Sequence, residues 1–251
     1  MITMLRSRGR DPSRSHVPSR SLDRALMYVC TAAICCGAVV WGAPVSLDTL
    51  TSHDAAGGLR AALSQGIDIA VSQLGTTNGF LNDPKVAIPL PSALEKADRA
   101  LRMVGMGAEA DKLKVGMNHA AEDAVADAKP IFKAALQKMT LADAKGILTG
   151  GDDAGTQYFR RVTSDQLTSK FKPTIARETS KLQLAPLYDR YAGKAAELGL
   201  VKKQDADLND YVTARALDGL FSRIADEERA IRKDPLGQAN SLIKKVFGAV
   251  R

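Results

Sequence analysis

The sequence predicts an all-α protein, a single compact, bundle-like domain of eight to ten helices that follows an N-terminal export segment. Aromatic residues make up only 5% of the chain, and alanine and leucine dominate its apolar residues, which favours packed helices over strands. Apolar residues recur at the three- and four-residue spacing of a helix face. No run of five or more residues alternates between apolar and polar as a half-buried strand does.

The export segment is the uncharged, apolar stretch of residues 25–43. It follows a tail that holds six arginines, and a basic region before an apolar core is typical of a secretory signal. At 19 residues, the stretch also has about the length, ~18 residues, that can span a bilayer. We therefore expect residues 1–42 to be a basic tail with a signal cleaved near Gly42, or an inner-membrane anchor formed by residues 25–43. Either places residues 43–251 in the periplasm, with membrane contact only through the N-terminal segment.

More than half of the net charge of +7 lies in residues 1–42, which hold six arginines and two aspartates and so carry a balance of +4. The rest of the chain carries a balance of +3 without a basic run or an aromatic-interleaved basic patch, so we expect no nucleic-acid partner. All three cysteines, Cys30, Cys35 and Cys36, lie in the apolar stretch. The domain itself therefore has no disulfide framework, no thiol nucleophile and no cysteine metal site.

Four helices are expected in the first half of the domain, at residues 52–74, 92–104, 108–129 and 130–139. The first two end at Gly75 and Gly105, which are typical C-cap residues. Ser92 and Glu95 have the spacing of a capping box. Pro130 ends or kinks the third helix and can begin the fourth.

Between the first two helices, residues 76–91 form an extended connection stiffened by three prolines. Its apolar side chains, Phe80, Ile88 and Leu90 among them, can serve in two ways. They can border a binding site, because a stiff segment loses little entropy on docking. They can also close the protein's own core as a lid.

In the second half, Thr140 and Asp143 form a capping box before a short helix that ends near Leu148. After a Gly-Gly turn, Asp152 or Asp153 is placed to cap the next helix. The remaining elements are a helix with Tyr158 and Phe159, another that Ser164 caps and Pro173 interrupts, one at 185–198, the longest from near Asp207 to before Pro235, and a last short one around 242–247.

Five long strings lie in this domain: GFLNDPKVAIPLP (79–91), MTLADAKGILTGGDDAGTQYFR (139–160), YVTARALDGLF (211–221), EERAIRKDP (227–235) and KKVFG (244–248). With these strings the chain resembles, over residues 47–248, an uncharacterised family of bacterial proteins, domain of unknown function 4197. The resemblance implies an exported, helical, single-domain protein. It implies no activity, substrate or catalytic residue.

Two acidic patterns are candidates for a site. Asp152 and Asp153 can bind a cation or act as an acid/base pair, or they can satisfy the free N–H groups of the following helix. Residues Asp205, Asp207, Asn209 and Asp210 copy the first half of a calcium loop. The loop lacks the glycine at position six and the glutamate at position twelve, so these residues are weak metal candidates or a plain helix start.

The domain carries no zinc-binding histidine pair, nucleophile motif or phosphate loop, so no catalytic residue and no cofactor is predicted. We expect a non-catalytic binding or envelope-associated module for an envelope protein or an apolar ligand. The alternative is a carboxylate-based hydrolase acting on a cell-envelope substrate, with acids drawn from Glu122, Asp123, Asp152, Asp153, Glu227 and Glu228. Two carboxyl groups ~5–9.5 Å apart across a cleft would favour the hydrolase.

Overall fold

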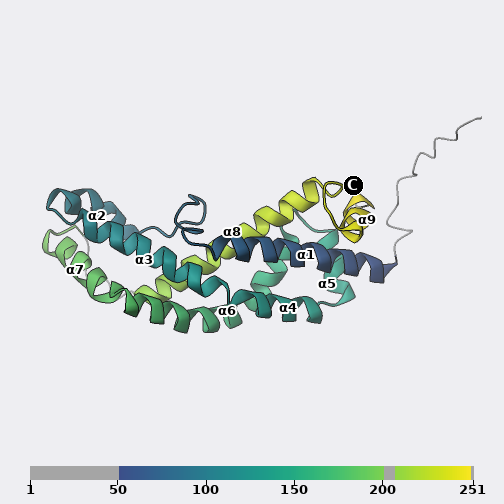
Figure 1. The fold of residues 1–251 in the computed structure, drawn as a ribbon, viewed down its shortest axis with the longest axis horizontal. Helices are drawn as coiled ribbons and strands as arrows, with labels where there is room; N and C mark the ends of the chain where they lie inside the picture. The colour runs from purple at the N-terminus through teal and green to yellow at the C-terminus, as the bar shows by residue number, and fades with distance from the viewer. Residues whose placement is uncertain (1–50, 201–206, 250–251) are drawn as a thin grey trace, which may run out of the picture. The chain divides into compact units, whose positions relative to one another are not determined.

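The computed structural model describes residues 51–200 and 207–249 (Figure 1). This part of the chain contains nine α-helices, joined by turns and loops, and no β-strand. The all-α class is therefore confirmed. In chain order the helices are α1 (Ser52–Leu74), α2 (Ser92–Met103), α3 (Gly107–Val125), α4 (Ala128–Lys138), α5 (Leu141–Leu148), α6 (Ala154–Lys181), α7 (Leu184–Glu197), α8 (Leu208–Lys233) and α9 (Ser241–Ala249). The proposed export segment lies outside the described residues.

The long helices build the core. Helix α8 packs against α1, α3 and α6, and α6 also contacts α4, α5 and α7. Phe132 of α4 lies edge-on to Phe159 of α6 and to Phe221 of α8, with ring centroids 5.2 and 6.1 Å apart. Figure 1 shows α2 and α7 together at one end of the helices and α5 and α9 at the other.

Local capping signals are partly correct. The Thr140–Asp143 capping box is formed at the start of α5, as predicted. The one predicted at Ser92 is wrong, because α2 is capped by Pro91 without a side-chain hydrogen bond. Helix α3 ends at Val125, earlier than predicted, and α4 begins two residues before Pro130. A proline in the first turn is tolerated there, because its missing N–H would have no helical acceptor.

Helix α6 is one continuous helix of 28 residues and not the two helices that were predicted, which also makes it longer than α8. The Ser164 hydroxyl donates to the Arg160 carbonyl instead of capping a new helix. Pro173 lies inside the helix, where it costs ~3 kcal/mol. Large apolar side chains are buried on both sides of the proline, at ~1.5–3 kcal/mol each, and outweigh that cost: Tyr158, Phe159, Leu167, Phe171 and Ile175.

Helix α9 lies directly on α1 at Gly58. A Cβ atom at that position would lie 2.8 Å from the Leu242 carbonyl oxygen, closer than real side chains approach. The glycine therefore permits the contact that holds the C-terminal helix in place. Among the described helices, none is both long enough and apolar enough to cross a bilayer.

Candidate functional site

The acid pair before α6 does not cap that helix with a side chain. Asp153 occupies the N-cap position but makes no capping hydrogen bond, contrary to the prediction, and its Oδ2 accepts from Gln157 Nε2 at 3.2 Å. Asp152 is exposed to solvent. Neither carboxylate is buried against another acid, so the structure gives the pair no acid/base geometry.

The carboxylate that caps α6 belongs to Glu228 of α8, a residue only 4% exposed. Its Oε1 accepts the Gly155 N–H at 2.9 Å, and its Oε2 accepts the N–H and the hydroxyl of Thr156, each at 2.8 Å. Arg232 Nη2 donates to Glu228 Oε1 at 2.8 Å and to the Ile147 carbonyl at 2.9 Å. One buried ion pair therefore joins the end of α5 and the start of α6 to α8.

Glu122 of α3, 5% exposed, has a similar structural role. Its two oxygens accept the N–H groups of Asn78 and Phe80 at 3.0 and 3.1 Å. Among the other hydrolase candidates, Asp123 is exposed and Glu227 lies 3.7 Å from Arg223 Nε. The hydrogen bonds of the two buried acids thus come from backbone, threonine and arginine donors, and Glu122 Oε2 also lies 3.9 Å from His119 Nε2. The two carboxylates are not paired with one another, which leaves the hydrolase alternative without a free carboxylate pair.

Residues 79–91 close the core. Phe80, Ile88 and Leu90 are 0, 2 and 1% exposed, so none of them can border an open binding site in this structure. The Asn118 side chain binds both backbone groups of Ile88, accepting its N–H at 2.8 Å and donating to its carbonyl at 3.0 Å. Of the two interpretations of this segment, the structure favours the lid.

The residues that resemble the first half of a calcium loop bind different partners within the fold. Asp207 caps α8 and accepts the Asn209 N–H at 2.7 Å. Asn209 Oδ1 accepts from the Thr179 hydroxyl, and Asp210 lies 2.6 Å from Lys172 Nζ. Asp205 falls outside the described residues. Within the described part of the chain, no three or more His, Cys, Asp or Glu side chains form a group that could hold a metal ion.

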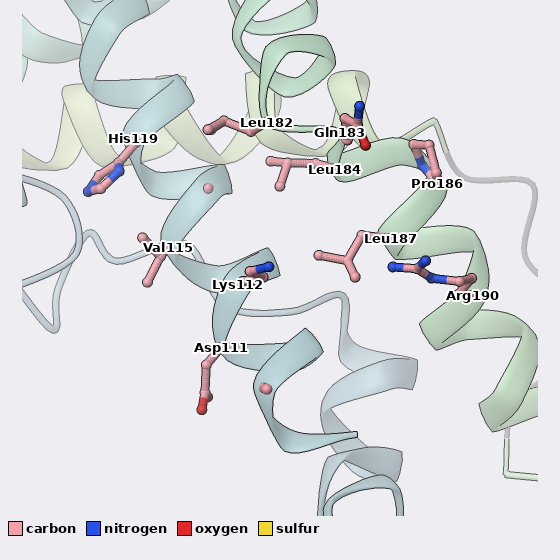
Figure 2. Close-up of a pocket in the computed structure, with 12 residues that line it drawn as sticks. Asp111, Lys112, Val115, His119, Leu182, Gln183, Leu184, Pro186, Leu187 and Arg190 are labelled. Atoms are coloured by element: carbon pink, nitrogen blue, oxygen red, sulfur yellow. The ribbon is translucent and has the colours of Figure 1, made fainter. Parts of the chain in front are cut away.

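Another candidate site lies between α3 and the turn that joins α6 to α7 (Figure 2). It is an open groove of about 660 Å³, within the ~300–1,000 Å³ of small-molecule sites. Its surface is mainly aliphatic, with Val115 on α3 and Leu182, Leu184, Pro186 and Leu187 on the side of α6 and α7.

Three local features shape the groove. Gly116 of α3 leaves room for Leu184, because a Cβ there would lie 2.6 Å from Leu184 Cδ2. Gln183 has a left-handed backbone (φ 51°), which turns the chain sharply between α6 and α7. Leu182 and Val115 remain 49% and 37% exposed and form the open part of the apolar surface.

Two positively charged side chains lie at the edge of this apolar surface. Lys112 of α3 and Arg190 of α7 reach toward one another across Leu187 (Figure 2). Both are exposed, and neither makes a hydrogen bond or ion pair with any residue that the structure describes. His119, at the far side of the groove, has its Nε2 3.0 Å from Asn78 Oδ1.

The acid at the groove is already neutralised. Asp111 lies 2.6 Å from Arg102 Nη2, and this guanidinium holds the pKa of the Asp111 carboxyl below its usual value. The groove therefore combines an apolar surface with uncompensated positive charge. Sequence reasoning missed it, because residues some 70 positions apart line it and no local pattern joins them.

The comparisons with known proteins give one result. A family model described as "Protein of unknown function (DUF4197)" matches residues 49–248, a range that contains α1 to α8 and nearly all of α9. It therefore includes both walls of the groove. No curated protein and no solved structure matches the chain.

Proposed function

This chain belongs to the DUF4197 family, and from that premise we propose that it is a non-catalytic, exported binding protein whose ligand occupies the groove between α3 and α7. The observation that carries the proposal is the groove itself. In this groove an aliphatic surface left open to solvent lies beside two cations that have no partner among the described residues, and contact of apolar surface with water costs free energy. Ligand binding would recover that cost.

The internal use of the buried acids supports binding over hydrolysis. Carboxylate-based hydrolysis needs a carboxyl group within hydrogen-bond reach of a substrate. Glu122 and Glu228 are inside the fold and hold backbone N–H groups, while His119 is the sole histidine of the groove. The alternative, a carboxylate-based hydrolase of the cell envelope, has no comparable geometric support.

We further propose that the domain acts in the periplasm. The basis is the sequence of residues 1–42, with its arginine-rich tail and apolar core. After fractionation we expect the domain in the periplasm, shortened near Gly42. Full-length protein in the membrane would support the anchor formed by residues 25–43, and full-length protein in the cytosol would refute export.

Binding in the groove can be tested with a neutral apolar dye, N-phenyl-1-naphthylamine, whose fluorescence rises in an apolar site. We expect saturable binding to the purified protein and its loss in Val115→Asp. Val162→Asp is a matched control, because Val162 lies on α6 outside the groove and is 40% exposed, against 37% for Val115. Equal dye binding by the two variants, or no saturable binding by the wild type, would contradict the proposal.

A further inference from the structure

We infer that the ligand of this groove is a single-chain amphiphile with one anionic head group, a carboxylate or a phosphate. The head would lie between Lys112 and Arg190, and the hydrocarbon chain would lie along the aliphatic surface of α3 and α7. The inference rests on the proposed binding function and specifies its ligand.

The charge of the groove selects an anion. Lys112 and Arg190 come from separate helices, point toward the same space and have no acidic partner among the described residues. Ammonium and guanidinium groups bind carboxylates and phosphates through charge-assisted hydrogen bonds. A cationic ligand would meet repulsion from both residues.

The nearby acids do not cancel this charge. Asp98 and Asp111 both bind Arg102, at 2.8 and 2.6 Å. Lys114 is close enough to lower the pKa of each carboxyl as well. These two acids and two bases balance one another, so the net charge at the groove remains that of Lys112 and Arg190.

The apolar surface selects a hydrocarbon chain. Val115 and Leu182 are exposed, and the buried Leu184 and Leu187, 2% and 7% exposed, line the same groove. Each methylene group buried there raises affinity about fourfold. A volume of about 660 Å³ is that of a small-molecule site, whereas a protein partner requires a much wider surface.

The test is displacement of the neutral dye by twelve-carbon amphiphiles that differ only in their head: dodecanoate, dodecyl phosphate, dodecanol and dodecyltrimethylammonium. We expect one or both anions to displace the dye at about tenfold lower concentration than the cation, with dodecanol between them. The stronger of the two anions identifies the head group. Added salt should reduce the preference, because the cations are exposed.

The double variant Lys112→Gln/Arg190→Gln should lose the preference for anions and still bind the dye. The control Lys133→Gln/Lys138→Gln removes the same charge from exposed positions of α4, outside the groove, and should keep the preference. Equal displacement by anion and cation in the wild type, or an anion preference that survives in the groove variant, would overturn the ligand class while the dye still reports a binding site. Absence of all dye and amphiphile binding would overturn the binding function as well.

Discussion

Glu122 and Glu228 show what a buried carboxylate does in this domain. A charge taken out of water is tolerated when it is paired and fully hydrogen-bonded. Glu228 meets that condition with two N–H groups, a hydroxyl and Arg232, and in doing so it satisfies the free donors at the start of α6. The acids beside that helix start, the exposed Asp152 and the half-buried Asp153, are therefore not needed as side-chain caps.

Removing these acids should give very different losses of stability. We expect Glu228→Ala to lower the free energy of unfolding by ~3–5 kcal/mol, because Arg232 and the N–H groups of α6 lose their partner. Asp153→Ala should cost under ~0.5 kcal/mol. Glu227→Ala is the matched control, since Glu227 precedes Glu228 and makes one looser ion pair. Urea denaturation measures all three, and a larger loss for Asp153→Ala would refute this account of the cap.

At the scale of elements, the connection between α1 and α2 is as much a part of the core as a helix. Its apolar side chains are buried, and its backbone is held by the side chains of Glu122 and Asn118 and by the Tyr211 hydroxyl, which donates to the Pro89 carbonyl at 3.0 Å. The connection was predicted to be extended throughout, but residues 77–86 form turns with backbone hydrogen bonds of their own, and only residues 87–91 are extended. Buried backbone groups that have no partner in a turn require such side-chain partners.

Polar substitution in this connection separates a lid from a binding edge. Ile88→Ser and Leu90→Ser should each lower stability by at least ~2–5 kcal/mol, the cost of truncating a buried aliphatic side chain, and should lower the melting temperature markedly. Lys85→Ser, in the same segment, is the control, because the Lys85 side chain is 68% exposed. The melting temperature is measured by circular dichroism. An unchanged melting temperature in the Ile88 and Leu90 variants would contradict the lid and support a binding edge.

For the whole molecule, ionisable groups limit stability at both ends of the pH scale. Burial pushes up the pKa of Asp98, but hydrogen bonds from Arg102 and Tyr191 bring it below its usual value. Hydrogen bonds from Lys181 and Arg177 lower the pKa of Glu178. Burial raises the pKa of the tyrosines Tyr158, Tyr188, Tyr191 and Tyr211.

These shifts predict a plateau of stability between about pH 5 and pH 9. The lowered carboxyl pKa values stabilise the fold above the unfolded value of about 4, and this contribution is lost as pH falls further. The raised tyrosine pKa values stabilise it below about pH 10, and this contribution is lost as pH rises beyond that. Melting temperature against pH tests both limbs. A melting temperature that rises between pH 4 and pH 3 would contradict the acid limb.

The all-α class and most helix positions follow from local information. Helical spacing, the Thr140–Asp143 box and the Asp207 cap depend on residues within four positions of one another, which can be compared along the chain. The family was identified from contiguous strings for the same reason. Helix α6 shows the limit, because the packing of its buried face on α3, α4 and α8 outweighs the local effect of Pro173.

The roles of the acids and the groove depend on contacts between distant residues. Glu228 and Gly155 are 73 positions apart, and their hydrogen bond exists because α8 crosses the start of α6. Lys112 and Arg190 likewise line one groove only because α3 packs on α7 near Gly116. From the sequence alone, a charged residue is most simply interpreted as exposed to solvent. Its neighbours in the folded structure decide whether it caps a helix or binds a ligand. Those neighbours are set by the burial of apolar faces, a sum over the whole domain that no short stretch of sequence contains.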